Sequence, residues 1–380
     1  AYLRSLGTFR DDFIDFLSGL TFEGDVFAIP EGEAVFPQEP LLRITAPLIQ
    51  AQLVETYLLN IVNYSTMIAS KAARVSIACD GRPYVDFSAR RTHGPDTSIL
   101  AARAAYIAGA SATSNVMAGK AFGIPVSGTM AHSYVMTFPD ERSAFFAFAR
   151  AFPANAIFLI DTFDTLQGAR AAAGVAEELR EEGISVRAVR LDSGDLATLA
   201  REVRALLDDL GHPEIQIFAS GDLDEYRVAD LLSRDSPIDG FGVGTRLGTS
   251  SDAPFLGAIY KLVEDKAGPK RKLSTGKMTL PGLKQVYRLI SDGKFERDVL
   301  ALQEESPVEG GQPVLLRAME KGRRIVPHVD NASSTQSARE RFTRTLANIP
   351  EPLRSLGRSA SYEVSLSPAL AALVPHWNSG

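Results

Sequence analysis

The sequence predicts an α/β fold in which parallel strands alternate with crossover helices, and three observations lead to this prediction. From about residue 74, short β-rich runs alternate with helical stretches, and a polar cluster follows nearly every run. The helices often close on a glycine just before the next strand, as at Gly123, Gly183 and Gly211. This alternation is typical of a barrel or of an open doubly wound sheet, and both remain open at this point.

The first seventy residues predict a short helix, two strands and a long helix. Residues 10–17 have helical spacing, whereas residues 25–30 and 40–45 are β-rich with turn residues between them. From Pro47 onward, apolar residues recur near helical spacing with few charges. We therefore expect a long helix there that is buried on most sides.

Six strands are predicted in the repeating part of the chain, each followed by a helix. They cover residues 83–87, 124–127, 156–160, 185–191, 215–219 and 240–244. The C-terminal part returns to short strands at 272–280, 285–289 and 314–317, and then to a charged helix at 337–346. We expect three segments. Residues 71–258 form the catalytic α/β part. Residues 1–70, which include the long helix, and residues 259–380 together form a second module.

Composition excludes several classes of protein. The net charge of −6 over 380 residues argues against nonspecific nucleic-acid binding. No apolar run approaches the roughly 20 residues that cross a bilayer, and the first residues lack the apolar stretch of a signal peptide. The single cysteine, Cys79, excludes a disulfide framework and a cysteine-rich zinc site. We expect a cytoplasmic protein without nucleic-acid or membrane partners.

Polar residues follow the predicted strands where α/β proteins form their active sites. The clusters are 88–91, 129–132, 161–164, 192–195, 220–224 and 244–246. Because the carboxyl ends of parallel strands meet on one face, we expect the clusters to form one constellation. Strand ends also carry turn residues and helix caps, so each cluster taken alone is equally consistent with a cap.

His132 is the histidine that this pattern singles out. It follows one predicted strand, and Asp161 and Asp192 follow two others. A carboxylate that holds one ring nitrogen frees the other nitrogen for nucleophilic or proton-transfer work. The alternative is a hydrogen-bonded histidine with no catalytic task.

Arg190 lies inside an apolar strand, and a buried arginine needs an anionic partner. A planar carboxylate bound through two hydrogen bonds would satisfy it. Of the two carboxylates that follow this strand, Asp192 and Asp195, one is expected to cap the next helix.

Two turns rich in small residues predict an anion site. Ser220-Gly221-Asp222 and Gly242-Val243-Gly244-Thr245 end successive strands and open toward helices, where backbone N–H groups can bind phosphate. Arg246 follows the second turn, and Arg90-Arg91 ends another strand. Together these cations favour a substrate with several phosphates, although the Arg90-Arg91 pair is also consistent with a surface position.

In this order the motifs resemble the nicotinate phosphoribosyltransferase family. The similar stretches are 26–74, 90–96, 113–120, 128–133, 161–164, 190–195, 220–222, 242–245, 277–282 and 284–288, so the resemblance covers nearly the whole chain. It implies an irregular seven-stranded, TIM-like α/β barrel beside an open-faced α+β sandwich formed by both termini. It also implies a homodimer with shared active sites.

The resemblance implies a reaction as well. Nicotinate and phosphoribosyl pyrophosphate would give nicotinate mononucleotide and pyrophosphate in NAD salvage, with ATP as cosubstrate, Mg²⁺ on the pyrophosphate and no metal held by protein residues alone. ATP would phosphorylate His132, supported by Asp161 and Asp192. The implied substrate contacts are Phe87 stacking on the pyridine, Arg90 on pyrophosphate, Thr129 and Arg190 on nicotinate, and Ser220, Gly221, Gly244 and Thr245 on the ribose 5-phosphate.

The sequence departs from the family in two places, and other functions remain as alternatives. The family's N-terminal segment with a Thr-Asp-Xaa-Tyr motif is missing from this sequence, and Ser88-Ala89 and Thr92-His93 replace the family's frequent Gly-Leu and Ala-Gln. The alternatives are a nicotinamide or quinolinate phosphoribosyltransferase, a sugar-phosphate lyase or isomerase, and a barrel that only binds ligands. Arg190 favours a substrate that carries a carboxylate.

Overall fold

The computed structural model describes residues 1–272, 279–325, 329–357 and 360–374. The chain divides into two compact units: unit 1 comprises Ala1–Ile61, Ala258–His328 and Ser361–Gly380, and unit 2 comprises Val62–Gly257 and Val329–Ala360. Most of the strand predicted at 272–280 lies outside the described residues. Within the described ranges, no helix combines the length and the apolar character that crossing a membrane requires.

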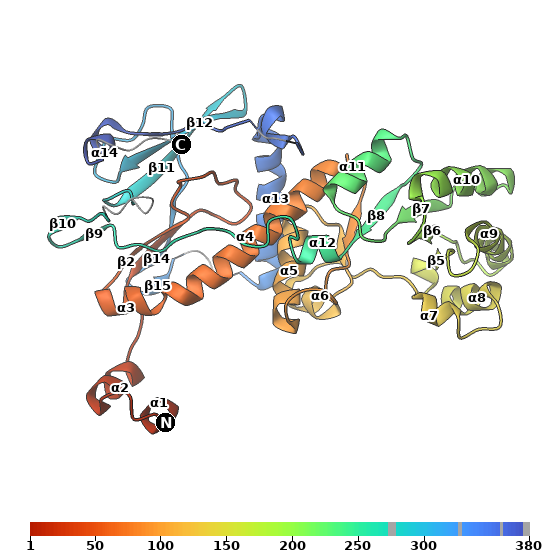
Figure 1. Ribbon diagram of the computed structural model, residues 1–380, viewed down its shortest axis with the longest axis horizontal. Coiled ribbons are helices and arrows are strands. Elements are labelled where there is room, and N and C mark those ends of the chain that lie inside the picture. The colour runs from red at the N-terminus through yellow and green to blue at the C-terminus, as the bar shows by residue number, and fades with distance from the viewer. Residues whose placement is uncertain (273–278, 326–328, 358–359, 375–380) are drawn as a thin grey trace. The chain divides into compact units, whose positions relative to one another are not determined.

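Unit 2 is built on a parallel sheet of six short strands (Figure 1). Their spatial order is β4 (Ala112–Thr113), β3 (Tyr84–Asp86), β8 (Gly240–Val243), β7 (Gln216–Ala219), β6 (Ala188–Leu191) and β5 (Ile157–Leu159). The first and last strands predicted in the repeating part are therefore neighbours, with Tyr84 opposite Phe241. The mixed α/β prediction is confirmed for this unit.

The sheet of unit 2 curls into a half-barrel. All six strands contribute to the lining of one cavity of about 170 Å³, through Val85, Ala112, Ile157, Ala188, Ile217 and Gly240. The predicted strand at 124–127 forms a single parallel bridge, between Val126 and Thr113, instead of a ladder. Six strands pair in the described part of this sheet, so the seven strands implied by the resemblance stay a prediction.

Helices connect the strands of unit 2 and cover the outside of the sheet (Figure 1). They are α5 (Pro95–Ile107), α6 (Val116–Phe122), α7 (His132–Val135), α8 (Glu141–Ala151), α9 (Thr165–Glu181), α10 (Leu196–Asp209), α11 (Glu225–Ser233), α12 (Thr245–Gly248) and α13 (Asn331–Asn348). Asp164, Asp195 and Asp224 cap α9, α10 and α11 by accepting a hydrogen bond from a backbone N–H group of the first turn. Asp195 is thus the predicted cap, which leaves Asp192 available to the site.

Small residues let these helices pack closely on the sheet. The face of α9 that meets the sheet carries alanines, and a Cβ atom added at Gly168 would lie 2.2 Å from the backbone oxygen of Ile160. Phe145 on α8 stacks on Phe158 of β5, with ring centroids 4.7 Å apart. Such close packing leaves the strand ends, and hence the side chains that follow them, little room to move.

Unit 1 joins strands from both ends of the chain. Strand β1 (Asp25–Ala28) pairs with β2 (Leu42–Thr45) and with β14 (Leu316–Glu320), which itself pairs with β15 (Arg323–Arg324). A second sheet contains β11 (Lys284–Ser291), β12 (Lys294–Leu302), β13 (Gln312–Pro313) and β16 (Val364–Leu366). The remaining elements are α1 (Tyr2–Ser5), α2 (Asp11–Ser18), α3 (Leu48–Leu53), the start of α4 (Glu55–Ala78), β9 (Glu264–Asp265), β10 (Gly268–Pro269) and α14 (Pro368–Ala372).

A buried charge cluster holds the second sheet of unit 1 together. The Arg288 guanidinium pairs with the Asp298 carboxylate at 2.7 Å, and Tyr362 donates a hydrogen bond to Asp298 at 2.8 Å. Glu39, whose side chain is fully buried, lies 3.9 Å from Arg288. Burial, and then the adjacent Asp298 carboxyl group, raise the pKa of Glu39 to about 9. Glu39 is therefore protonated at neutral pH and hydrogen bonds within the cluster as a neutral acid.

This cluster predicts a pH-dependent stability. Because the folded-state pKa of Glu39 lies above the unfolded value, its stabilising contribution is complete below about pH 4.5 and is lost as the pH rises through about 9. Between pH 6 and 9 the free energy of unfolding should fall by up to about 1.4 kcal/mol per pH unit from this group. Thermal unfolding of Glu39→Gln should lack this decline, and a pH slope identical to that of the wild type would contradict the assignment.

Candidate active site

The carboxyl ends of the unit 2 strands carry a polar cluster centred on Arg190. From β6, the Arg190 guanidinium donates hydrogen bonds to Ser220 Oγ at 2.8 Å, to Thr129 Oγ1 at 2.8 Å and to Asp192 Oδ1 at 2.7 Å. Its side chain is 15% exposed, so these bonds form in a partly desolvated setting. Four of the predicted site residues are thus brought together from three strand ends.

The anionic partner that we predicted for Arg190 is a residue of the same chain, Asp192. Asp192 supplies that charge through one nitrogen of the guanidinium, whereas we predicted a carboxylate bound through two hydrogen bonds. Among the described residues, the Nη1 nitrogen contacts two neutral acceptors, Thr129 Oγ1 and the backbone oxygen of Met130 at 3.4 Å. An anion that binds on this side would compete with neutral groups for the Nη1 hydrogens, and not with a second carboxylate.

Phe87 provides an aromatic wall beside this cation. The residue follows β3, and the Arg190 guanidinium carbon lies 5.6 Å from the centroid of its ring. A Cβ atom added at Gly242 would lie 2.6 Å from the Phe87 ring, so β8 must carry glycine there for the ring to fit. A flat aromatic ring that bears a carboxylate matches a phenyl face next to a guanidinium.

His132 begins α7 and faces two carboxylates. Its Nε2 atom lies 3.6 Å from Asp192 Oδ2 and 3.9 Å from Asp161 Oδ1. Its Nδ1 atom lies 3.2 Å from Thr162 Oγ1. The ring is 39% exposed, so solvent and ligands can reach it. A proton on Nε2 between the two carboxylates leaves the lone pair on Nδ1 available for attack.

One carboxylate oxygen of Asp161 accepts two hydrogen bonds, whereas the other has no hydrogen-bond partner among the described residues. Its Oδ2 atom accepts hydrogen bonds from the Asp192 backbone N–H at 2.9 Å and from Ser193 Oγ at 2.7 Å. Its Oδ1 atom is buried and has no hydrogen-bond partner in the described part of the chain. A buried acceptor without a partner attracts a proton or a cation, and His132 is the group that lies opposite it.

Asp192 links the histidine to the arginine. Burial alone would raise the pKa of Asp192, but the Arg190 charge, together with hydrogen bonds from Ser220 and Arg190, outweighs burial and lowers the pKa below its usual range. Asp192 therefore stays ionised across the neutral range. It can stabilise a positive charge on His132, which is needed when the ring gains a phosphoryl group or a proton.

The two turns predicted to bind an anion both contain glycines that pack against backbone atoms. Gly221 has a φ of +97°, and a Cβ atom there would lie 2.1 Å from the backbone oxygen of Asp192. This turn therefore requires glycine on both conformational and steric grounds. At the end of β8, a Cβ atom added at Gly244 would meet the Phe87 backbone oxygen at 3.1 Å. A side chain at Gly221 would clash with the backbone, and a side chain at Gly244 would require the Phe87 backbone to shift by a few tenths of an ångström.

The remaining predicted residues lie at the edge of this site. Arg90 is exposed on the turn after β3 and makes no hydrogen bond or ion pair with any residue that the structure describes. Thr245 begins α12 and is half-buried. The Arg246 Nε atom lies 3.9 Å from Asp224 Oδ2, so this cation is partly balanced by the cap of α11.

Sequence reasoning missed Glu141, Thr162 and Ser193. Thr162 contacts His132, Ser193 contacts Asp161, and Glu141 senses the charges of Asp161 and Asp164. Burial, followed by the negative charges of Asp164 and Asp161, raises the pKa of Glu141 to about 7. Its Oε1 atom is buried without a hydrogen-bond partner among the described residues. Glu141 follows the cap Asp140, and such a position is typical of an ordinary helix start, so spacing alone could not reveal it.

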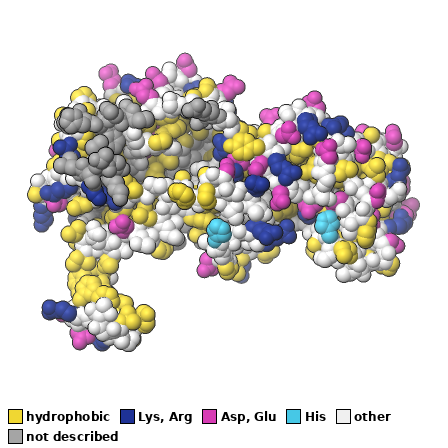
Figure 2. Space-filling model, viewed as in Figure 1, with side chains coloured by type: hydrophobic (Ala, Val, Ile, Leu, Met, Phe, Trp, Pro, Cys, Tyr) yellow, Lys and Arg dark blue, Asp and Glu magenta, His cyan; other side chains and the backbone are white. Residues whose placement is uncertain are grey.

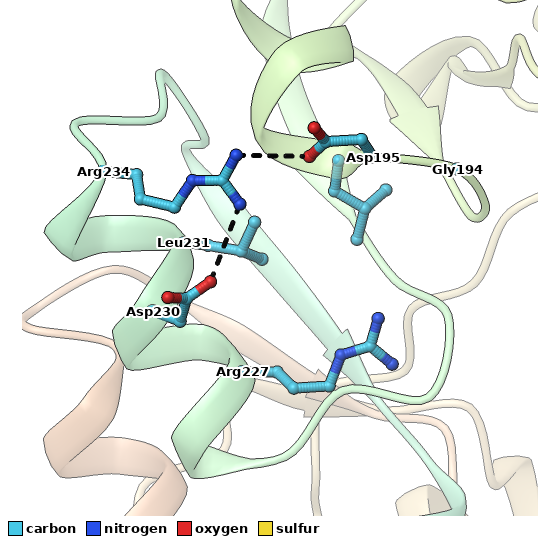
Figure 3. Close-up of a pocket in the computed structure, with 7 residues that line it drawn as sticks. Gly194, Asp195, Arg227, Asp230, Leu231 and Arg234 are labelled. Carbon is cyan, nitrogen blue, oxygen red and sulfur yellow. Dashed lines mark ion pairs between the residues drawn. The ribbon is translucent and has the colours of Figure 1, made fainter.

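A small pocket of about 110 Å³ lies between α10 and α11 (Figure 3). Arg234 bridges Asp195 at 3.5 Å and Asp230 at 3.7 Å across its mouth, and the Arg227 side chain borders it. None of the predicted site residues lines this pocket. Its ion pairs are exposed, and exposed pairs contribute little free energy, so we assign the chemistry to the Arg190 and His132 clusters.

Comparisons with known proteins agree with this geometry. The family described as nicotinate phosphoribosyltransferase (NAPRTase) N-terminal domain matches residues 1–63. A nicotinate phosphoribosyltransferase of Mycobacterium tuberculosis is 47% identical over 367 residues, which cover 96% of this chain and 78% of the relative. The nicotinate phosphoribosyltransferase of Bos taurus is 34% identical over 438 residues, covering 95% of this chain and 81% of the relative.

A solved structure extends the similarity to three dimensions. The crystal structure of human nicotinic acid phosphoribosyltransferase superposes with a TM-score of 0.84 at 29% identity, covering 98% of this chain and 87% of that chain. The sequence relatives and the structural neighbour carry the same family name, and each is matched over more than two thirds of its length. The chain therefore belongs to the nicotinate phosphoribosyltransferase family.

Proposed function

We propose that this protein transfers the phosphoribosyl group of phosphoribosyl pyrophosphate to nicotinate, giving nicotinate mononucleotide and pyrophosphate for NAD salvage. The observation that carries the proposal is the Arg190 guanidinium beside the Phe87 ring, with its Nη1 side turned to neutral acceptors. The nicotinate carboxylate would bind Arg190 and the Thr129 hydroxyl group, and the pyridine would stack on Phe87. The pyridine nitrogen would then attack the anomeric carbon while pyrophosphate leaves.

Phosphoribosyl pyrophosphate would bind through the two small-residue turns and the cations near them. Ser220, Gly221, Gly244 and Thr245 would hold the ribose 5-phosphate, and Arg90, which has no protein partner in the described ranges, would take the pyrophosphate. Catalysis then consists mainly of positioning and of stabilising the charges that develop as the bond to pyrophosphate breaks.

Mg²⁺ is expected on the pyrophosphate. Among the described residues, no group of three or more histidine, cysteine, aspartate or glutamate side chains is arranged to hold a metal ion. Mg²⁺ commonly takes most of its oxygen ligands from substrate phosphates and water, so it would arrive with its substrate and neutralise the leaving group.

We further propose that ATP hydrolysis is coupled to this transfer through a phosphohistidine at His132. With Nε2 held between Asp161 and Asp192, the Nδ1 atom would attack the γ-phosphorus of ATP, the bond from that phosphorus to the bridging oxygen would break, and ADP would leave. The ionised Asp192 would stabilise the positive charge on the ring, and Thr162 would hold Nδ1 in position before attack. Hydrolysis of the phosphohistidine would then drive the equilibrium toward nicotinate mononucleotide.

A product assay separates this function from its rivals. The purified protein is incubated with phosphoribosyl pyrophosphate and nicotinate, nicotinamide or quinolinate, each with and without ATP. We expect nicotinate mononucleotide to be the main product and ATP to increase its yield. A product from nicotinamide or quinolinate alone, or none from any pyridine, would contradict the proposal, and the latter result would favour a sugar-phosphate lyase or isomerase.

The phosphate cradle yields a specific prediction. In Gly244→Val the side chain would collide with the backbone of Phe87 and push the turn out of reach of a phosphate. We expect the Kd for phosphoribosyl pyrophosphate to rise roughly tenfold or more, without loss of any side-chain chemistry. Calorimetry measures the affinity, and Gly257→Val is the matched control because its Cβ would meet no atom within 4 Å. Normal affinity in folded Gly244→Val would remove this turn from the site.

Two structural features remain proposals. We propose that residues 124–127 complete an irregular seven-stranded barrel. A parallel bridge between Val126 and Thr113 supports this on one side, and a 2.9 Å hydrogen bond from the Asn155 side chain to the Gly128 backbone oxygen supports it on the other.

We also propose a homodimer with shared active sites, because unit 1 exposes apolar side chains on its N-terminal helices and on α3 (Figure 2), including Tyr2, Phe16, Leu48 and Leu53.

The homodimer predicts a specific mass in solution. Sedimentation velocity at micromolar concentration should give one species of twice the 41.0 kDa chain mass, since the exposed apolar side chains of the N-terminal helices and α3 are costly to leave in water. Leu48→Glu should shift the distribution toward the single chain, because it adds a charge to the apolar surface. A 41.0 kDa species at every concentration would contradict the dimer.

A further inference from the structure

Lys71 is a buried cation that the reaction described above does not use. It lies on the part of α4 that belongs to unit 2, and its side chain is 3% exposed. Its Nζ atom lies 2.7 Å from Glu225 Oε2 and 2.5 Å from Asp252 Oδ1. One ammonium group thus joins two carboxylates that are 27 positions apart in the sequence.

Each of these carboxylates follows one of the two small-residue turns. Glu225 is the first residue of α11, which begins directly after the turn 220–224. Asp252 comes four residues after α12, the helix that opens at Thr245. Because β7 and β8 are adjacent parallel strands, the two turns are neighbours, and Lys71 ties together the segments that leave them.

Arg74 completes the network and fixes Glu225 from its other side. The Arg74 Nε atom donates a hydrogen bond to Glu225 Oε1 at 2.8 Å, and Nη2 donates to the Tyr226 hydroxyl group at 2.8 Å. Two cations therefore balance two carboxylates, Glu225 and Asp252. The Glu225 side chain is fully buried, and a fully buried carboxylate is tolerated only when its charge is compensated. The first turn of α11 consequently has little freedom to move.

We infer that Lys71 is a positioning residue for phosphoribosyl pyrophosphate, because it sets the separation of the two turns that bind the ribose 5-phosphate. This inference rests on the proposed function. A phosphate held by backbone N–H groups from two turns needs both turns at a fixed distance, since these groups cannot extend toward the ligand as long side chains can. Lys71 supplies that constraint from α4, outside the cradle itself.

The test removes Asp252, the exposed carboxylate of the network. The Asp252 side chain is 44% exposed, so Asp252→Ala frees the segment after α12 and leaves the buried Lys71–Glu225–Arg74 contacts in place. We expect the KM for phosphoribosyl pyrophosphate to rise roughly tenfold, while the KM for nicotinate and kcat at saturation change less than about twofold. Asp252→Asn, which retains an acceptor for the Lys71 ammonium, should recover most of the affinity.

Two controls make the result decisive. Asp230→Ala removes an exposed carboxylate that pairs with Arg234 on α11 itself, and it should leave all kinetic constants unchanged. The double variant Lys71→Met/Glu225→Gln removes both buried charges at once, and it should show the same selective rise in the KM for phosphoribosyl pyrophosphate.

The outcomes separate this inference from the proposed function. An unchanged KM for phosphoribosyl pyrophosphate in Asp252→Ala, or an equal rise in the KM for nicotinate, would overturn the role of Lys71 while Gly244→Val still loses binding. If Gly244→Val also binds phosphoribosyl pyrophosphate normally, the cradle itself is wrong and both proposals fall.

Discussion

Replacement of His132 by alanine should abolish phosphorylation of the protein by ATP and should reduce ATP hydrolysis at least about a hundredfold, because it removes the imidazole whose Nε2 atom lies 3.6 Å from Asp192 and 3.9 Å from Asp161. Slow transfer of the phosphoribosyl group should survive, since Arg190 and the phosphate turns are unaffected. The stimulation of transfer by ATP should disappear with the imidazole ring.

The measurement uses γ-labelled ATP and tests for acid-labile, base-stable label on the protein. His93→Ala is the matched control, because His93 is an exposed histidine of the same unit, and it should become labelled like the wild type. Asp161→Asn should lower the labelling rate, because its unpaired Oδ1 atom faces the ring. Equal label in His132→Ala, or no label in an active wild type, would show that energy coupling does not pass through His132.

The second large effect is expected at Arg190. Arg190→Ala removes the cation proposed to bind the nicotinate carboxylate, at a cost of about 2–5 kcal/mol, which corresponds to a KM for nicotinate raised roughly thirtyfold or more. The pKa of Asp192 should also rise, because the Arg190 charge is what holds it below its usual range.

Steady-state kinetics with two pyridines test this prediction. Arg190→Lys keeps the charge but loses the planar fork, so it should fall between the wild type and Arg190→Ala. Any residual activity with nicotinamide should respond less than activity with nicotinate, because an amide carries no charge. Unchanged nicotinate kinetics in Arg190→Ala would exclude this residue from the site.

The sequence predicted the grouping of polar residues at the strand ends better than it predicted the sheet. Strand ends are marked by abrupt changes from apolar to polar residues, so the sequence alone was enough to assign Arg190, His132 and the two turns to one face. Strand β4 escaped prediction because two residues, Ala112 and Thr113, are too few to show a period. Residues 124–127 have the composition of a strand, yet they form only one bridge.

The parts of the site that sequence could not reveal depend on contacts between distant residues. Asp192 pairs with Arg190 across two positions at the end of β6, a spacing that places both side chains on one face, but spacing alone equally allowed a cap at Asp192. The raised pKa of Glu141 comes from burial, and then from the charges of Asp164 and Asp161, which lie 23 and 20 positions away. Lys71 lies in a helix whose pattern predicts only a buried face, and its two partners come from two other segments.

Asp192 contacts both Arg190 and His132, and this constrains how the protein can change over evolution or by engineering. Under the proposed function, a mutation that alters the charge at Arg190 or Asp192 should change pyridine preference and energy coupling in a single step, so the two traits should vary together at these positions. New pyridine substrates are more accessible through Phe87 or Thr129, which meet Arg190 without joining the acidic pair around the imidazole. Libraries that keep the Arg190–Asp192 pair and vary those two positions should therefore retain ATP coupling while they sample different rings.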